Sequence, residues 1–251
     1  MLPPAPAPDR VRFLMHRRFA HRGLHSGQAP LENSMAAFRA AIAAGDGIEC
    51  DVRLSADGVV YIFHDADMER LTGVSGAFTE QVSGRLGQLD LVGGNGPVPR
   101  LAALLEAAGP DTPVLIELKI DRGQPVAPLC AAVAQLLVEH HEAHAAVMSF
   151  HPGVSRWFAK HAPDIVRGLV MTENGDGAIS SNIMRHLAMR HAKPDFLAYD
   201  IRDLPSRFAT KARKQGFPVL SWTVRTPEQW QTVARYVDAP IYEVPGTGGD
   251  V

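Results

Sequence analysis

Residues 47–67 read GIECDVRLSADGVVYIFHDAD. The stretch begins as an apolar strand, yet Glu49 and Asp51 stand two positions apart in it, so both carboxylates are expected on one face. Asp57-Gly58 is a strong signal for a two-residue hairpin loop, after which the chain returns to His64. With that loop, Asp51 is predicted to pair opposite His64, their Cβ atoms roughly 4.5–5.5 Å apart.

Strand-like and helix-like runs alternate along the rest of the chain. The strand-like runs cover residues 18–22, 47–53, 113–119, 145–150, 165–171, 195–200, 217–224 and 239–244. Helical patterns fill the gaps, at residues 34–45, 100–109, 127–141, 153–162, 179–191, 205–216 and 227–237. This alternation indicates a parallel sheet, and its repetition predicts an α/β fold, a (β/α)8 TIM barrel. The apolar faces of the helices are expected to lie in the core.

The predicted domain organisation is a single barrel with one insertion. The barrel domain is expected over residues 11–245, and a Gly-rich stretch at about 66–98, after the second strand, is expected to be an inserted cap segment. Residues 1–10 are proline-rich and predict a disordered or extended lead-in. Residues 246–251 predict a flexible tail.

Composition excludes several classes of protein. The formal net charge of −2 offers no basic field for nucleic acid. The two cysteines, Cys50 and Cys130, are too few and too far apart for a disulfide framework, which suits a reducing compartment. The N-terminus lacks a signal peptide pattern, and no apolar run is long enough for stable membrane insertion. We therefore expect a cytoplasmic protein.

Charged residues gather at predicted strand ends, where (β/α)8 barrels carry their chemistry. The carboxylates of Glu49, Asp51 and Glu117 should converge there and repel one another unless a cation lies among them. An all-oxygen ligand set suits a divalent cation, Ca²⁺ or Mg²⁺. The alternative is that these acids only form ion pairs, with partners among Arg22, Arg53 and Lys119.

The neighbouring cations and histidines extend this prediction to a reaction. Arg22 and Lys119 follow the first and third strands and can hold phosphate oxygens. His21 and His64 are expected at the same mouth, where one can accept a proton from a nucleophile and the other can donate one to a leaving group. The combination favours a site for a phosphodiester.

Several motifs in order make the chain resemble the glycerophosphodiester phosphodiesterase family. They are His21-Arg22-Gly23, Glu32-Asn33-Ser34, Glu49-Cys50-Asp51, His64-Asp65, Glu117-Leu118-Lys119, Ser149-Phe150 and Ser221-Trp222-Thr223. The resemblance covers most of the chain. It implies a (β/α)8 barrel with a small insertion after the second strand. It also implies hydrolysis of small-molecule glycerophosphodiesters to glycerol 3-phosphate and an alcohol with a divalent cation, in lipid and glycerol metabolism.

Carried over residue by residue, the resemblance implies a role for each part of the site. His21 and His64 would be the catalytic acid–base pair. The metal would be held by Glu49, Asp51 and Glu117, and phosphate by Arg22 and Lys119. Trp222 and Phe150 would line the substrate pocket, although Trp222 could equally be barrel packing, and Glu32 and Asn33 would support the first loop.

One departure from the family pattern falls at the eighth strand. The family places a Thr-Asp-x-Pro pattern there, whereas this chain reads Ile241-Tyr242-Glu243-Val244-Pro245. The role of Glu243 is left open by the sequence, as are the alcohol preference, the oligomeric state and the choice between a cyclic intermediate and direct attack by water.

Two rival functions remain. The first is a related lipid-headgroup phosphodiesterase of the lysophospholipase D type, which an apolar or basic rim around the mouth would favour; the sequence shows no such amphipathic stretch. The second is a non-catalytic barrel that binds a metabolite. It ranks last because no histidine or acid of the motifs is missing.

Overall fold

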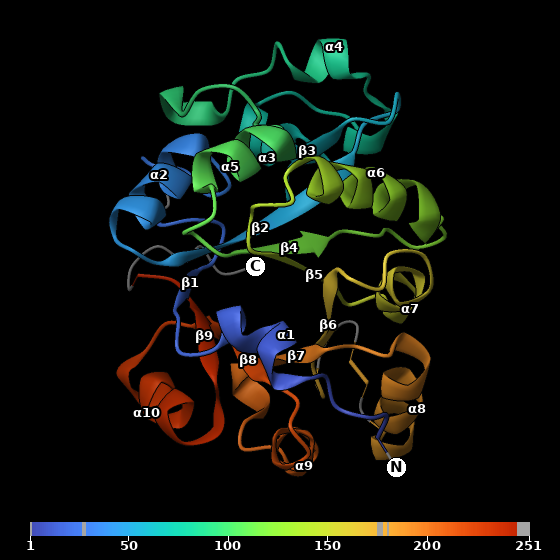
Figure 1. The fold of residues 1–251 in the computed structure, drawn as a ribbon. Coiled ribbons are helices and arrows are strands. Elements are labelled where there is room, and N and C mark those ends of the chain that lie inside the picture. The colour runs from blue at the N-terminus through green and yellow to red at the C-terminus, as the bar shows by residue number, and fades with distance from the viewer. Residues whose placement is uncertain (1, 27–28, 175–177, 180, 245–251) are drawn as a thin grey trace.

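The chain folds into a closed barrel. The structure is a computed structural model that describes residues 2–26, 29–174, 178–179 and 181–244. Its parallel strands are β1 (Phe19–Ala20), β2 (Gly47–Leu54), β4 (Val114–Leu118), β5 (Ala145–Ser149), β6 (Val166–Met171), β7 (Phe196–Asp200), β8 (Val219–Val224) and β9 (Ala239–Tyr242). Each strand pairs with the next, and β1 pairs with both β2 and β9 (Figure 1). The predicted (β/α)8 fold is confirmed.

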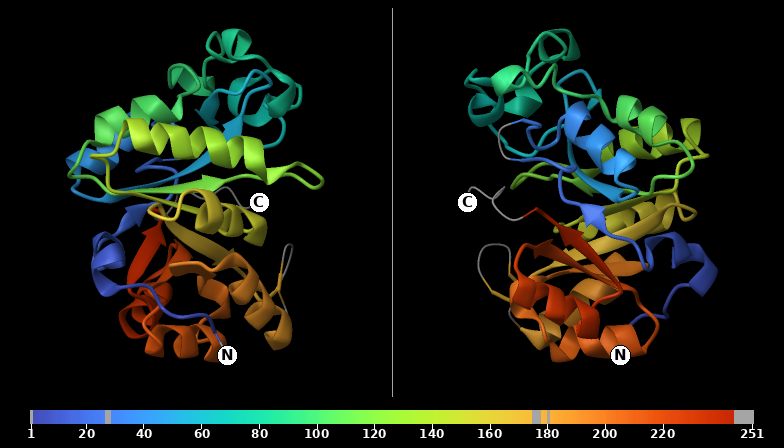
Figure 2. Two further views of the ribbon diagram at one scale, coloured as in Figure 1. Left: turned by 45° about the vertical axis from the view of Figure 1, so that its right-hand side comes forward. Right: turned by 90° about the vertical axis from the view of Figure 1, so that its left-hand side faces the viewer.

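The predicted helices lie around the barrel. They are α2 (Met35–Ala43), α5 (Leu101–Ala108), α6 (Val126–Glu139), α7 (Pro152–His161), α8 (Asn182–Ala192), α9 (Arg207–Lys214) and α10 (Pro227–Tyr236) (Figure 2). Side-chain caps set where several of them begin, because the first N–H groups of a helix have no partner within it. Ser34 accepts from the Ala37 N–H at the start of α2, and Thr226 forms a capping box with Gln229 at the start of α10.

The strands are buried on both faces, which is why they read as nearly continuous apolar runs. Cys50 and Ile116 point outwards into the layer between barrel and helices, where Phe38 and Leu104 also pack. Leu115 belongs to a second cluster inside the barrel, with Phe19, Phe196, Leu220 and Ile241. Glu117 follows Leu115 on the same face of β4, so the barrel interior changes from apolar to acidic towards the strand ends.

One expectation about the helices is wrong. Ile183, Met184 and Leu187 of α8 are exposed instead of lying in the core. The reason is that α8 already fills its inner face with other side chains, of which Met189 and Ala192 are fully buried.

The hairpin after β2 differs from its predicted register. Its second strand, β3 (Val60–Ile62), pairs antiparallel with β2, and Val52 lies opposite Ile62. Phe63 donates its N–H to the Asp51 carbonyl at 2.9 Å, so Asp51 lies opposite Phe63, and the predicted pairing with His64 is wrong. The loop is one residue longer than predicted because Ser55 closes it: its Oγ accepts the Val59 N–H at 2.8 Å and donates to Asp57.

The segment at 66–98 forms a cap above the β2 side of the barrel (Figure 2). It contains short helices, α3 (Glu69–Thr72) and α4 (Ser83–Leu86), and the 3-10 turns η2 (Phe78–Glu80) and η3 (Val92–Gly94). The cap has an apolar cluster of its own, in which Phe63 stacks on Phe78 with ring centroids 4.7 Å apart. This cluster anchors the segment that follows the hairpin.

The two ends of the chain bear on the predicted boundaries. Residues 2–7 form no helix or strand, after which the chain forms α1 (Pro8–Val11) and the 3-10 turn η1 (Arg12–Leu14). The turn of helix at Pro8–Val11 begins within the predicted lead-in, where Arg10 pairs with Asp195, 3.0 Å away. The predicted tail, 246–251, lies outside the described residues, and the domain boundaries stay a prediction.

Candidate active site

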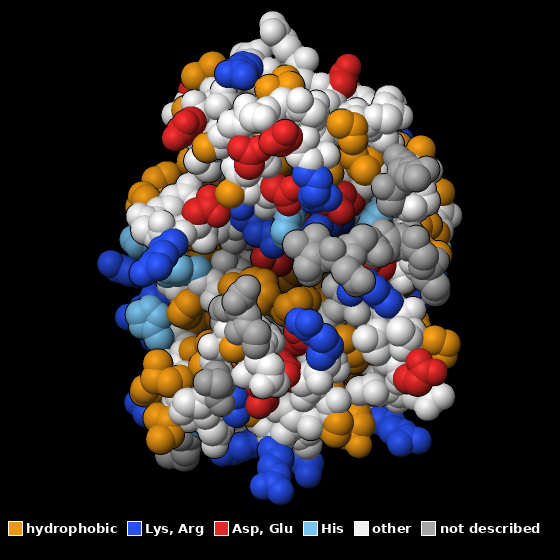
Figure 3. All heavy atoms as spheres, turned by 180° about the vertical axis from the view of Figure 1, so that it is seen from behind, with side chains coloured by type: hydrophobic (Ala, Val, Ile, Leu, Met, Phe, Trp, Pro, Cys, Tyr) orange, Lys and Arg blue, Asp and Glu red, His pale blue; other side chains and the backbone are white. Residues whose placement is uncertain are grey.

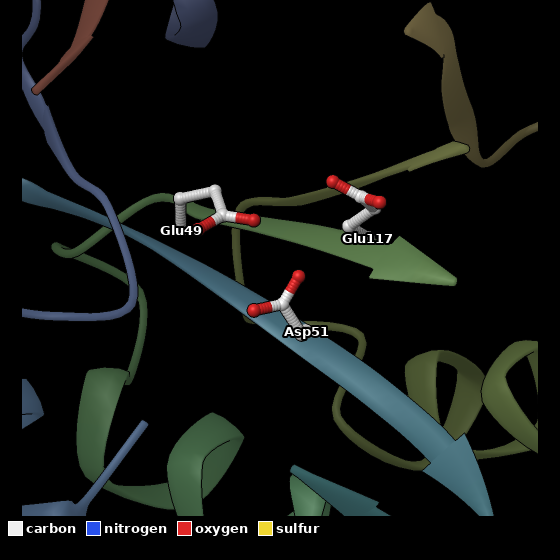
Figure 4. Close-up of side chains that lie close together, drawn as sticks. All are labelled: Glu49, Asp51 and Glu117. Carbon is white, nitrogen blue, oxygen red and sulfur yellow. The ribbon is translucent and has the colours of Figure 1, made fainter. Parts of the chain in front are cut away.

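Three carboxylates converge near the end of β4, two of them contributed by the neighbouring part of β2. Asp51 and Glu117 are neighbours in the register of these strands, and Glu49 precedes Asp51 on the same face of β2. The three side chains point towards one another, and one oxygen from each lies within 4.8 Å of the others (Figure 4). On the face opposite to Figure 1, acidic, basic and histidine side chains surround hydrophobic ones near the middle of the view (Figure 3).

Two of these acids have cationic partners. The Nζ of Lys119 lies 2.9 Å from Asp51 Oδ1 and 2.6 Å from Glu117 Oε1. The Nε of Arg22 lies 3.1 Å from Asp51 Oδ2, which also accepts a hydrogen bond from Asn33. Burial alone would raise the pKa of Asp51, but Lys119 and Arg22 outweigh it and hold that pKa well below its usual range.

Within the described residues, no Lys or Arg side chain forms an ion pair with Glu49. Its Oε2 accepts the backbone N–H of Arg22 at 3.0 Å and lies 3.9 Å from His21 Nε2. Its Oε1 is buried and has no hydrogen-bond partner. Burial, with the charges of Asp51 and Glu117, raises the pKa of Glu49 well above its usual range.

This arrangement fits a divalent cation. The ion-pair alternative accounts for Asp51 and Glu117 but leaves the buried oxygen of Glu49 unpaired. Arg53 does not pair with these three acids: it pairs with Asp121 at 2.7 Å and donates to the His64 carbonyl at 2.9 Å. A cation bound by oxygen ligands would satisfy Glu49 and relieve the repulsion among the three acids. The predicted residues therefore form a candidate acidic metal site.

His21 is held by the residue whose role the sequence left open. Its Nδ1 lies 2.5 Å from Glu243 Oε1, and Arg225 in turn binds both oxygens of Glu243, at 2.7 and 3.2 Å. Burial lowers the pKa of His21 to about 4, although the bond to Glu243 opposes this shift. Because Nδ1 is engaged by a carboxylate, Nε2 is the nitrogen turned to Glu49 and free for proton transfer.

His64 has an equivalent partner. Its Nδ1 lies 2.7 Å from Asp65 Oδ1, and Arg70 binds both oxygens of Asp65. Arg70 also binds Glu32, which pairs with Arg22 at 3.0 Å. Both histidines are thus oriented by carboxylates that arginines hold in place, an arrangement typical of catalytic imidazoles.

The loop after β1 places Arg22 through its backbone. Arg22 adopts a left-handed φ of 55°, and its carbonyl accepts the Asn33 N–H at 2.8 Å. Asn33, with φ of 56°, is buried and reaches Asp51, while Ser34 begins α2. Glu32 and Asn33 therefore contact the two residues predicted to bind phosphate and metal.

Phe150 and Trp222, the residues predicted to line the substrate pocket, lie just after β5 and within β8. Phe150 and Trp222 contact each other edge to face, with ring centroids 5.3 Å apart, and both pack on the inner apolar cluster. Trp222 donates its Nε1–H to the Ala198 carbonyl at 3.0 Å. These rings pack in the barrel and are also partly exposed, so both readings of Trp222 remain open.

Sequence reasoning missed the carboxylates and arginines that orient the histidines. Asp65 lies next to His64 in the sequence, so a His-Asp pair at a strand end was a signal for it. Glu243 and Arg225 come directly after β9 and β8, and nothing in their sequence spacing links them to His21.

Removing the charge of Glu243 tests this orientation. Glu243→Gln is expected to lower kcat about 10–100-fold with little change in KM, because a neutral amide holds the imidazole of His21 less firmly in one tautomer. Steady-state kinetics measures the effect, with Glu228→Gln, an exposed acid on α10, as the matched control. An unchanged kcat in Glu243→Gln would show that His21 does not depend on this contact.

Comparison with known proteins shows which family this chain is similar to. A model described as the glycerophosphoryl diester phosphodiesterase family matches residues 21–247. The chain is 32% identical over 241 residues to "Probable glycerophosphodiester phosphodiesterase 2" of Mycobacterium tuberculosis, covering 89% of this chain and 86% of that protein. It is 30% identical over 151 residues to the lysophospholipase D GDPD1 of Homo sapiens, covering 55% of this chain and 46% of the relative.

Coverage and a solved structure complete the comparison. Among the first three curated relatives, the chain spans from 25% to 86% of the relative's length. A phosphodiesterase of Oleispira antarctica, solved in complex with the product sn-glycerol-3-phosphate, has a TM-score of 0.80 and 25% identity, covering 93% of this chain and 94% of that one.

Proposed function

The chain belongs to the glycerophosphoryl diester phosphodiesterase family, and on that premise we propose that it hydrolyses glycerophosphodiesters to glycerol 3-phosphate and an alcohol. The observation that carries the proposal is the buried group of Glu49, Asp51 and Glu117 beside an oriented imidazole, that of His21. The product bound to the Oleispira antarctica phosphodiesterase supports the same substrate class.

The two histidines carry the proton transfers. His21 and His64 each have Nδ1 engaged by a carboxylate, so each presents Nε2 to the reacting atoms. One accepts a proton from the attacking hydroxyl, and the other donates a proton to the oxygen of the departing alcohol. The carboxylates of Glu243 and Asp65 orient the rings and stabilise the charge that each ring gains when it is protonated.

Positive charge beside the acids binds the phosphate. Arg22 offers a planar guanidinium and Lys119 an ammonium, and both lie within 3.1 Å of Asp51. Glu49, Asp51 and Glu117 would hold a divalent cation, Ca²⁺ or Mg²⁺, which would stabilise the negative charge that builds on the phosphoryl oxygens. Trp222 and Phe150 provide an apolar wall for the substrate.

A lipid-headgroup phosphodiesterase remains the second candidate. The human relative is a lysophospholipase D, and α8 exposes apolar side chains that the sequence did not predict.

None of the helices in the described part of the chain has the length and apolar composition needed to cross a bilayer. Cys50 and Cys130 are both free and buried, which supports the cytoplasmic location that we propose.

A headgroup assay distinguishes the two functions. The full chain is freed of metal with a chelator, then supplied with Ca²⁺ or Mg²⁺ and given glycerophosphodiesters with choline, ethanolamine, glycerol or inositol headgroups, or a lysophospholipid. We expect metal-dependent release of glycerol 3-phosphate from at least one glycerophosphodiester. Release of lysophosphatidic acid alone would favour the second candidate, and hydrolysis of none of them would overturn both.

A further inference from the structure

Helices α7, α8 and α9 carry an unbalanced charge. They contain no Asp or Glu, although the chain as a whole has a net charge of −2. Their basic residues are Arg156, Lys160, Arg185, Arg190, Arg207, Lys211, Arg213 and Lys214. Three consecutive helices on one side of the barrel therefore present positive charge without acidic residues of their own between them.

Most of these cations are not used by the fold. Arg185 is buried against Glu173, and Arg213 pairs with Asp238 at 2.8 Å. The remaining ones are exposed, and within the described part of the chain they have no ion-pair partner: Arg156, Lys160, Arg190, Arg207, Lys211 and Lys214. Their charges are available to a partner.

One of these three helices, α8, also carries an apolar strip. Ile183, Met184 and Leu187 are 73%, 54% and 53% exposed, and their spacing puts them on neighbouring positions of the first two turns. The other large hydrophobic side chains that are exposed in the described residues are valines, located on the cap, α6 and the segment after β9. The strip is thus a local concentration of large apolar groups that the core does not need.

A basic hollow lies along α9. A depression of about 720 Å³ is lined by Arg207, Lys211 and Lys214 and by uncharged residues of the same helix and the residues beside it, with no acid in the lining. A second hollow, of about 420 Å³, shares Arg207 and Lys211 and extends to Asn182 and His186 on α8. The hollows connect the basic surface of α9 to the helix that carries the apolar strip.

The acids in the second hollow are already engaged. Glu173 accepts from Ser206 Oγ at 2.5 Å and pairs with Arg185 at 3.2 Å. Asp203 accepts from the Glu173 N–H at 2.6 Å and from the Asn174 amide. Asp203 keeps its negative charge, but among the described residues neither Arg207 nor Lys211 forms an ion pair with either acid.

We propose that this surface, defined by Ile183, Met184 and Leu187 with Arg207, Lys211 and Lys214, docks on an anionic lipid bilayer. The apolar side chains enter the boundary between headgroups and acyl chains, while the basic side chains contact anionic headgroups. Three apolar side chains supply little of the roughly 800 Å² that each partner of a stable protein complex buries. A bilayer needs only a few such insertions together with basic residues.

The location of α8 gives docking a consequence. In a (β/α)8 barrel each helix begins on the side where the preceding strand ends, so the first turn of α8, with Ile183 and Met184, lies towards the mouth that holds Glu49 and His21. Docking goes beyond the proposed function and does not depend on it: the surface binds lipid whatever the site hydrolyses. Bound there, the protein is held where lipid-derived diesters gather.

Vesicle sedimentation tests the proposal with the full chain. We expect binding to phosphatidylcholine vesicles that contain about one-third phosphatidylglycerol, little binding to phosphatidylcholine alone, and release as salt is raised. Lys211→Glu/Lys214→Glu should weaken binding at least about tenfold, since each lost cation weakens it about fivefold. Ile183→Ser/Met184→Ser/Leu187→Ser should weaken it by at least about the same factor, since it removes the apolar side chains that enter the bilayer. The matched controls, Val138→Ser on α6 and Arg39→Glu/Arg85→Glu, should bind like the parent protein.

The readouts separate docking from misfolding and from other partners. Each variant should keep its thermal midpoint and its turnover of a soluble phosphodiester, because none of these residues belongs to the catalytic site. Equal binding to neutral vesicles, equal losses in the controls, or unchanged binding in both surface variants would overturn the proposal. So would dimers that the surface variants disrupt, in a protein that does not bind vesicles.

Discussion

Replacing Glu49 with glutamine is expected to abolish divalent-cation binding and to lower kcat at least about a thousandfold. The change keeps the shape of the side chain but removes its charge, and an amide oxygen is a weaker ligand for a hard cation than a carboxylate. Among the described residues, the buried Oε1 of Glu49 has no hydrogen-bond partner, so we expect Glu49 to be a ligand of the cation. Calorimetry with Ca²⁺ and Mg²⁺ measures the loss of binding, and steady-state kinetics the loss of turnover.

The stability of the metal-free protein should move in the opposite direction. Burial and the neighbouring acids raise the pKa of Glu49, which means that its charged form is unfavourable in the folded protein. Glu49→Gln removes that charge, so the free energy of unfolding without metal should stay the same or rise. Glu106→Gln, an exposed acid on α5, is the control for both measurements. Full activity of the parent protein in the presence of a chelator would refute the role of the metal.

Removing either imidazole is expected to produce the second large effect. His21→Ala and His64→Ala should each lower kcat about 10²–10⁴-fold, because general acid–base catalysis contributes a factor of that size. KM should change little, since we propose that Arg22 and Lys119, and not the histidines, hold the phosphate. The two variants should be far from additive when combined, because both groups act in the same proton transfers.

His141→Ala provides the control for the histidine variants. His141 is exposed beyond the C-terminal end of α6 and contacts no residue of the site, so its loss should leave kcat unchanged. Retention of near parental kcat in His21→Ala or in His64→Ala would remove that histidine from the mechanism.

The three acids of the candidate site differ in the partners that they have. Asp51 and Glu117 share Lys119, and Arg22 adds a second cation to Asp51. These pairs hold the strand ends together without a bound ion. Among the described residues, neither Lys nor Arg forms an ion pair with Glu49, so the acid that lies beside His21 is the one whose buried oxygen is left without a partner.

The hairpin shows why register was less predictable than strand order. Asp57-Gly58 indicated a turn, and a turn is present, but the hydroxyl of Ser55 closes a loop one residue longer. Each change of one residue in loop length shifts the pairing of the two strands. A side-chain hydrogen bond of this kind leaves no periodic signal in the sequence, and so Phe63 rather than His64 lies opposite Asp51.

The sequence by itself determined the barrel and the residues at its mouth. A parallel strand buried on both faces must be apolar, so acids such as Glu49 and Glu117 stand out at once, and strand direction collects them at one end. Only the tertiary structure decided which partners these residues have. Glu243 contacts His21 from a position more than 200 residues away in the chain. Ile183 is exposed because other side chains of α8, Met189 and Ala192 among them, occupy the face that packs on the barrel. Periodicity reports which face of an element is buried, whereas contacts between distant elements arise only when the barrel closes.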